Sequence, residues 1–182
     1  MRRRTFVGGA TAWPALRGRV AASRARACAA TAAAAGAPAP ALAAPSQPGE
    51  LVRWPDVKLL DGRVWSAEQA RGQAVIVVFW STTCPFCLRH NAHLEQLRRA
   101  LAGQPVQILT AARDREVQAV QRYLQRHGYG FAVTMDHAPL AEALTTRKVI
   151  PLTVLVDRQG RLKQVIPGEM FEEDVMALRN LS

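Results

Sequence analysis

The chain has 182 residues and a formal net charge of +10, a length that accommodates one ordinary domain and a further segment. No stretch approaches the ~20 apolar residues of a membrane-spanning helix. Residues 1–48 contain seven arginines and no acid, whereas residues 49–182 hold 17 basic groups against 14 acids. The charge therefore belongs mostly to the N-terminal segment. Because basic and acidic residues are interleaved in the remainder, the composition argues against a nucleic-acid-binding protein.

Residues 1–48 have the composition of a targeting leader, rich in Ala, Arg and Pro and unsuited to forming a packed core. The stretch RRTFVGG, residues 3–9, resembles a twin-arginine export signal, and small residues around Ala43 suit cleavage by a signal peptidase. We therefore predict a leader over 1–48 and a periplasmic domain over 49–182. Two alternatives remain, namely a general secretory signal with residues 27–35 as its apolar core, and a mitochondrial transit peptide.

The first half of residues 49–182 predicts a hairpin, a short helix and a buried strand. Residues 54–65 alternate around Asp61-Gly62, which indicates a hairpin. Ser66 is a suitable N-cap for a helix that stops at Gly72. The run AVIVVFW, residues 74–80, is typical of a strand that is buried on both faces.

The second half continues the alternation of helices and strands. Leu94, Leu97 and Leu101 predict a helix that closes at Gly103, with Glu95, Arg98 and Arg99 on its opposite face. Arg98 and Arg99 are expected to be solvated. The elements expected after it are a strand at 106–112, a helix at 115–128, a short extended segment at 131–136, a helix that begins after Pro139, strands at 152–157 and 161–168 joined by a hairpin, and a helix at 171–181. This order predicts an α/β domain with a central mixed sheet and helices on both faces.

Cys84 and Cys87 follow the buried strand directly, in the sequence STTCPFC. A two-residue spacer closes too small a loop to stabilise a fold usefully. Cys84 falls at the start of a helix, where free N–H groups and the helix dipole favour a thiolate, and Pro85 is tolerated in the first turn. We therefore predict a redox centre in which Cys84 is the nucleophile and Cys87 the resolving thiol.

Two motifs together resemble the thioredoxin superfamily, and more narrowly the TlpA/ResA-like exported thiol-disulfide oxidoreductases. They are VVFWSTTCPFC and, later in the chain, VIPLTVLVDRQGRL. The resemblance extends over residues 50–182 and implies a thioredoxin-like fold with an N-terminal β-hairpin extension. It also implies a cis bond before Pro151, facing the cysteines, with the backbone of Ile150 free to pair with an extended substrate.

The resemblance further implies which molecules the protein meets. Protein thiols and disulfides are the expected substrates, and a membrane thiol-reducing protein of the DsbD/CcdA kind is the expected electron donor. No cofactor beyond the Cys84–Cys87 disulfide and no bound metal are expected, and the protein is expected to be a monomer.

The sequence departs from the superfamily pattern at the redox centre. Val78 occupies the position of the buried acid of thioredoxins. The group that accepts the proton of Cys87 is therefore unassigned, with Glu142 and Glu169 as the acids considered. Pro85 resembles the oxidant DsbA, whereas Phe86 and Ile150 favour a reductase. We predict reduction or exchange at about −150 to −250 mV.

Other functions remain as alternatives to a reductase. They are a DsbA-like oxidant, a Sco-like copper-delivery protein that uses both cysteines and His137, a peroxiredoxin, and a redox-inactive interaction domain. His90 is on the same helical face as Cys87 and is expected to be an exposed helix residue. Arg113 and Arg115 are expected on a solvated helix face.

Overall fold

The structure is a computed structural model that describes residues 44–181. Most of the predicted leader, including Cys28 and Ala43, lies outside these residues. The backbone N–H of Ser46 donates to the carbonyl of Ala143 at 3.0 Å. Within the described part of the chain, no helix has the length and apolar character needed to cross a membrane.

A five-stranded mixed sheet forms the centre of the domain, with the strand order β5-β4-β3-β6-β7. Strands β3, β4 and β5 run parallel, whereas β6 is antiparallel to β3 and β7 is antiparallel to β6. The strands are β3 Ala74–Trp80, β4 Val106–Ala112, β5 Ala132–Thr134, β6 Leu152–Val156 and β7 Leu162–Pro167. The predicted α/β fold with a central mixed sheet is confirmed.

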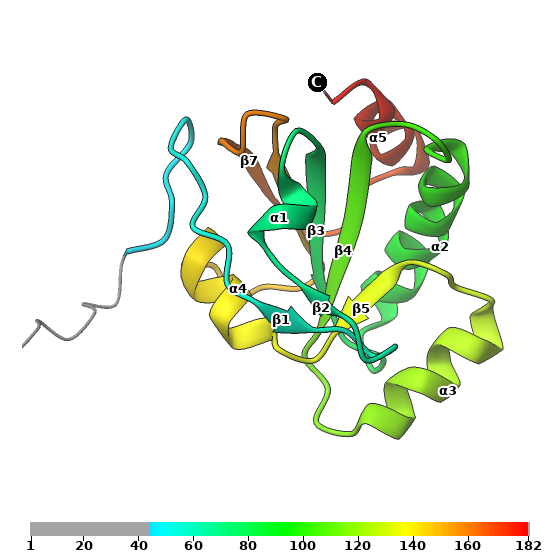
Figure 1. The fold of residues 1–182 in the computed structure, drawn as a ribbon. Helices are drawn as coiled ribbons and strands as arrows, with labels where there is room; N and C mark the ends of the chain where they lie inside the picture. The colour runs from blue at the N-terminus through cyan, green and yellow to red at the C-terminus, as the bar shows by residue number, and fades with distance from the viewer. Residues whose placement is uncertain (1–43, 182) are drawn as a thin grey trace, which may run out of the picture. The chain divides into compact units, whose positions relative to one another are not determined.

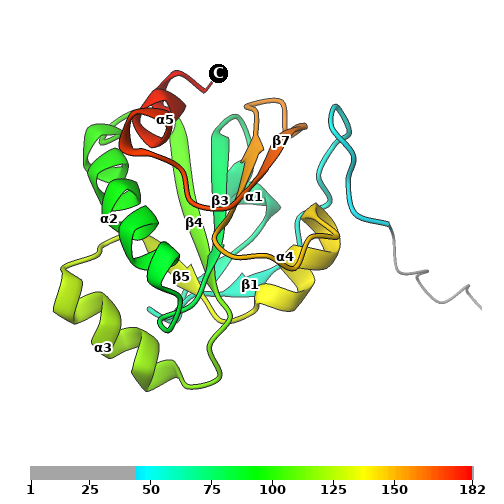
Figure 2. The ribbon, with the colours of Figure 1, turned by 180° about the vertical axis from the view of Figure 1, so that it is seen from behind.

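Helices cover both faces of the sheet, as Figures 1 and 2 show from opposite sides. Every residue of β3 is buried because alternate side chains face different layers. Ile76, Val78 and Trp80 belong to the core cluster that contains residues of α2, α3 and α5, whereas Val75, Val77 and Phe79 belong to the cluster of α1 and α4. The helices are α1 Ala67–Ala70, α2 Pro85–Ala100, α3 Val117–His127, α4 His137–Leu144 and α5 Glu172–Ala177.

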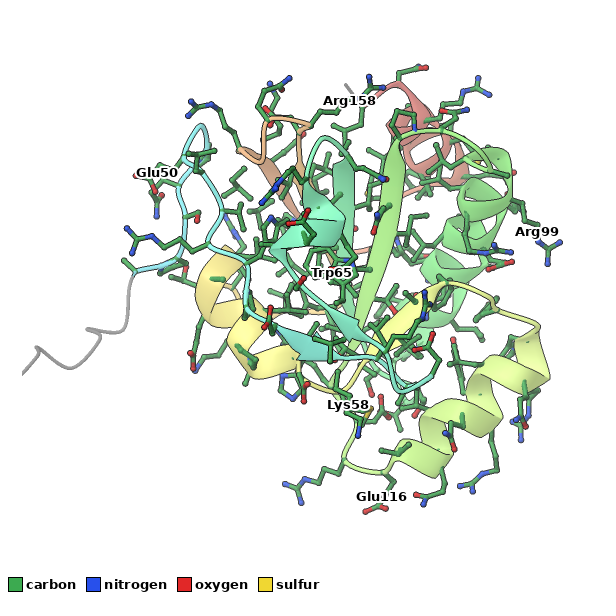
Figure 3. All side chains as sticks on the ribbon, in the orientation of Figure 1. Glu50, Lys58, Trp65, Arg99, Glu116 and Arg158 are labelled. Atoms are coloured by element: carbon green, nitrogen blue, oxygen red, sulfur yellow. The ribbon has the colours of Figure 1, made fainter. Side chains whose placement is uncertain are left out.

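The predicted N-terminal hairpin is present as β1 Val57–Lys58 and β2 Val64–Trp65, which pair antiparallel. Gly62 has a φ of +87° in the turn between them, a conformation that glycine adopts without strain. Trp65 is only 4% exposed and donates its indole N–H to the side chain of Gln107 at 3.2 Å. Figure 3 labels Trp65 between the hairpin and the sheet. This extension therefore closes the face of the sheet that α1 and α4 also cover.

The structure corrects the bounds of two predicted helices. Helix α4 begins at His137, before Pro139 and not after it, and proline is tolerated there because N–H groups of the first turn have no intrahelical partner. The last helix is α5, which ends at Ala177 and continues as a 3-10 turn over Leu178–Asn180. It therefore does not extend as one α-helix to Leu181.

Three polar residues are less exposed than the helical pattern predicts. Glu95 and His90 of α2 are 5% and 1% exposed, so neither lies on a solvated face. Arg113 is half-buried and lies after β4, outside any helix. The expectations for these residues were wrong because the packing of loops and strands against α2 and β4 depends on the tertiary fold.

Candidate active site

Cys84 is the N-cap of α2, at the point where the chain leaves β3. Its Sγ accepts a hydrogen bond from the backbone N–H of Cys87 at 3.3 Å. This contact satisfies one of the free donors of the first helical turn, as a polar N-cap side chain does. Cys84 is half-buried, and both thiols are free. The first turn of α2 thus holds a thiol at the protein surface with a donor directed at its sulfur.

Cys87 occupies a different environment one turn further along the helix. Its side chain is fully buried. Burial, and then the hydrogen bond with Cys84, raises the pKa of the Cys87 thiol to about 12, because a low-dielectric site disfavours the charged form. At neutral pH Cys87 therefore keeps its proton, and the two thiols differ in both access and ionisation.

The loop before β6 brings the other two predicted site residues to the cysteines. The Ile150–Pro151 peptide bond is cis, and Sγ of Cys84 lies 4.0 Å from the carbonyl oxygen of Ile150. The carbonyl of Pro151 accepts from the N–H of Gly168 at 2.9 Å. Within residues 44–181, neither the N–H nor the carbonyl of Ile150 bonds to another backbone group. The backbone of Ile150 in the loop before β6 therefore lies beside the nucleophile without another backbone partner among these residues.

Of the two acids considered for proton transfer from Cys87, one is bonded to an arginine and the other lies on the opposite face of the sheet. Val78 is fully buried and pairs with Thr153 in the sheet. Glu169 forms two hydrogen bonds of 2.6 Å with the Arg89 guanidinium. Glu142 is exposed on α4, the helix on the opposite face of the sheet from α2. Neither carboxylate is thus placed by the structure as the acceptor for Cys87.

His90 is a buried polar residue that sequence reasoning placed on the surface. Its Nδ1 accepts from the backbone N–H of Met170 at 3.2 Å, and its Nε2 lies 3.2 Å from the hydroxyl of Thr153. Nε2 must then carry the proton. Burial, and then the charge of His93, lowers the pKa of His90 to about 4. His90 therefore joins α2 to β6 and to the segment before α5 as a neutral imidazole.

Asp114 is a further residue that sequence reasoning missed. Its carboxylate accepts from the N–H of Thr82 at 3.0 Å, from the Thr82 hydroxyl, and from the Ser81 hydroxyl at 3.3 Å. A signal for it was available, because parallel strands such as β3 and β4 end at the same edge of a sheet. A polar residue that closely follows β4 therefore lies beside the loop that follows β3.

Hollows of the surface lie both away from the cysteines and beside them. One hollow, of about 1100 Å³, lies between residues 44–55 and α4. A groove of about 340 Å³ lies beside Cys84, lined by Leu88 of α2 and by Tyr123, Arg126 and His127 of α3. No group of three or more His, Cys, Asp and Glu side chains suited to a metal occurs within residues 44–181, so His137 does not form such a group with the cysteines.

Comparison with known proteins agrees with this geometry. The sequence matches the AhpC/TSA family over residues 35–165. It is 29% identical over 123 residues to the thiol-disulfide oxidoreductase ResA of Geobacillus kaustophilus, covering 66% of this chain and 71% of that protein. It is 28% identical over 116 residues to the ResA of Halalkalibacterium halodurans, covering 64% and 66%.

Solved structures show the same fold. A thioredoxin-family thiol:disulfide interchange protein from Chlorobium tepidum superposes with a TM-score of 0.65 at 22% identity, covering 75% of this chain and 95% of that one. StoA from Bacillus subtilis superposes with a TM-score of 0.60 at 19% identity, covering 70% and 96%. The chain therefore belongs to the AhpC/TSA family, has a thioredoxin-like fold and is a thiol-disulfide oxidoreductase that is similar to the ResA proteins, as its two motifs predicted.

Proposed function

We propose that this protein is exported and reduces or exchanges disulfide bonds of periplasmic proteins through the Cys84–Cys87 dithiol. The observation that carries the proposal is the difference between the two thiols. Cys84 is accessible, receives an N–H donor and faces the Ile150 carbonyl, whereas Cys87 is buried and protonated. In such an arrangement the exposed thiol attacks the substrate disulfide, and the buried thiol later releases the substrate from the mixed disulfide.

The proposed reaction has two displacements. The Cys84 thiolate attacks one sulfur of a substrate disulfide, which forms a mixed disulfide and releases the other substrate sulfur as a thiolate that takes up a proton. Cys87 then loses its proton and attacks Sγ of Cys84, which breaks the mixed disulfide and releases the second substrate thiol. The substrate disulfide gains two electrons, and the enzyme dithiol becomes the Cys84–Cys87 disulfide. No other cofactor is part of this scheme.

The substrate is proposed to pair with the loop before β6. Among the residues that the structure describes, the N–H and carbonyl of Ile150 bond to no other backbone group. They offer one residue of strand pairing to an extended chain, with the carbonyl giving up its contact with Sγ of Cys84. Pro151, which has no N–H to donate, leaves the ladder open at this point. This pairing would bring a substrate sulfur to the side of Cys84 that faces Ile150.

The direction of electron flow is proposed to be reducing. Phe86 is 55% exposed, and its side chain cannot donate a hydrogen bond to a thiolate. The reduced centre therefore lacks the stabilisation that a polar residue at this position would supply, and such stabilisation is what makes a dithiol oxidising. The oxidised centre would be re-reduced by a dithiol protein, for which a membrane donor of the DsbD/CcdA kind is the expected class.

The test is to trap the mixed disulfide. A Cys87→Ser variant, expressed with its leader, should accumulate adducts through Cys84 with periplasmic proteins, because the resolving thiol is missing. Cys84→Ser is the matched control and should accumulate none. Dithiothreitol should reduce the mixed disulfides and release the trapped proteins, and peptide mapping should assign the adducts to Cys84.

Equilibration of the wild-type protein with glutathione redox buffers measures its redox potential, which then shows whether the protein reduces or oxidises its substrates. A potential within or below the range of about −150 to −250 mV supports reduction or exchange, whereas a value near the −120 mV of DsbA would make the protein an oxidant. Absence of adducts in Cys87→Ser, together with failure to reduce insulin, would overturn the enzymatic proposal itself.

A further inference from the structure

We propose that Arg113 and Asp114 form a clamp that positions both active-site loops and sets the potential of the cysteines by their opposite charges. The two residues are adjacent and directly follow β4. One side chain bonds to the loop that leads into Cys84, and the other bonds to the loop that leads into Pro151. The inference rests on the proposed function, because it concerns how the same dithiol is tuned.

Asp114 forms the arm of the clamp that holds the cysteine loop. Its carboxylate accepts from the backbone N–H and the hydroxyl of Thr82, and from the hydroxyl of Ser81. Ser81 Oγ is also 3.1 Å from Thr83 Oγ1. These bonds fix the three residues that connect β3 to Cys84, and with them the place where α2 begins. Asp114 is therefore a positioning residue for the nucleophile.

Arg113 forms the arm that holds the loop before β6. Its guanidinium donates to the carbonyl of Lys148 at 2.6 Å and lies over the ring of Phe79, 5.5 Å from its centroid. Its backbone N–H donates to the carbonyl of Trp80 at 2.8 Å. Lys148 is two residues before Ile150, so this bond fixes the segment that is proposed to receive the substrate.

The two charges act on the thiols with opposite signs. The fixed carboxylate of Asp114 is one of the causes that raise the pKa of Cys87, after burial and Cys84. The guanidinium of Arg113 lies over Phe79 of β3, the strand that leads into the cysteine loop. Burial lowers the pKa of Arg113, and a Cys87 thiolate, once formed, acts to raise it. A negative charge near a dithiol disfavours its thiolate and makes the centre more reducing, whereas a positive charge makes it more oxidising.

The experiment measures the equilibrium of each variant with glutathione. Asp114→Asn keeps an acceptor for Thr82 but removes the charge, so the equilibrium constant for oxidation should fall about three- to tenfold. This corresponds to a potential that is more positive by about 15–30 mV. Arg113→Met removes the positive charge and should shift the potential in the negative direction. The same variant should slow the reduction of a protein disulfide more than its reaction with oxidised glutathione, because both reactions depend on the thiolate but a small disulfide does not need the Ile150 loop.

Matched controls lie at the next two positions. Arg115→Met and Glu116→Gln make the same changes of charge at exposed residues, and Figure 3 shows Glu116 at the beginning of α3, directed away from the sheet. Both should leave the potential and the ratio of the two rates unchanged. Thermal unfolding of each variant establishes that it is folded.

The clamp is refuted if folded Asp114→Asn keeps the wild-type potential, or if the Glu116→Gln control shifts it equally. The positioning role of Arg113 is refuted if Arg113→Met slows the small and the protein disulfide alike. These outcomes differ from failure of the proposed function, which would appear as absence of mixed disulfides in Cys87→Ser while the potential of the centre remains measurable.

Discussion

The two halves of α2 use polar side chains in opposite ways. The first turn leaves Cys84 half-exposed, with its sulfur against an N–H group and a carbonyl from another loop. Further along the same helix, His90 and Glu95 are buried and bond to groups outside the helix. His90 accepts from Met170 and contacts Thr153, and Glu95 accepts from the N–H of Gly130 at 2.9 Å.

This difference separates reactivity from positioning within one helix. A buried polar group costs free energy unless it is hydrogen-bonded, so the bonds of His90 and Glu95 fix the helix against β6 and against the loop before β5. Cys84 has few such ties, and its sulfur remains available for exchange. Substitutions in the first turn should therefore change activity without changing stability, and those in the buried half should do the reverse.

The largest expected effect is on activity. Cys84→Ser should lower the rate of insulin reduction at least about a thousandfold, because the attacking sulfur is lost. The free energy of unfolding of the reduced protein should stay within about 1 kcal/mol of the wild-type value, because serine is itself a good N-cap. Chemical denaturation of the two reduced proteins measures the second quantity. A large loss of stability would break the distinction between the two halves of α2.

Sequence reasoning located the reactive half of α2 better than the buried half. Cys84 and Pro151 are identified by residue type and by the elements around them, and the strand at 74–80 follows from an unbroken apolar run. The pattern that placed Glu95 opposite the leucines is correct for an isolated helix. It fails here because the chain before β5 passes over that face and supplies the N–H of Gly130. Asp114 was missed because its partners follow another strand, although the parallel pairing of the two predicted strands indicates that the segments after them lie close together.

The second prediction concerns pH and the buried imidazole. The pKa of His90 is lowered from 6.5 to about 4, so the unfolded chain binds a proton more readily than the native one. The contribution of this lowered pKa to the free energy of unfolding is therefore fully present above pH 6.5. It is lost as the pH falls toward 4, and the total loss is at most about 3 kcal/mol. His90→Gln should flatten this part of the stability curve, as urea denaturation at several pH values would measure.

His127→Gln is the matched control for this measurement. His127 is exposed in the last turn of α3, so His127→Gln makes the same chemical change at a surface position, and the slope between pH 4 and 6.5 in His90→Gln is compared with the slope in this variant. An equal slope in His90→Gln and in the wild type would contradict the assignment of a neutral, buried His90. The exchange activity of His90→Gln at neutral pH tests the comparison further, and it should be close to that of the wild type while the variant is folded.

The smallest expected effect concerns the buried acid of α2. Burial acts to raise the pKa of Glu95, but hydrogen bonds from Arg98, Gly130 and Arg99 outweigh it and lower the pKa to about 2. Glu95→Gln should cost about 2 kcal/mol at neutral pH, a typical contribution of hydrogen bonds to a charged group. Because the lowered pKa stabilises the protein above pH 4.5, the difference between variant and wild type should shrink as the pH falls from 4.5 toward 2.

Glu142→Gln, on the exposed face of α4, makes the same chemical change and should alter stability by less than about 0.5 kcal/mol. Figure 3 shows Arg99 directed outward from α2, so Arg99 is free to rehydrate when Glu95 is replaced. Glutamine keeps an acceptor oxygen for the Gly130 N–H, but it removes the negative charge that accepts two hydrogen bonds from the half-buried Arg98 guanidinium. Most of the loss should therefore arise from the charge-assisted bonds with Arg98. A loss of stability in Glu95→Gln no larger than that in Glu142→Gln would show that the charge of this buried carboxylate contributes nothing to the stability of α2.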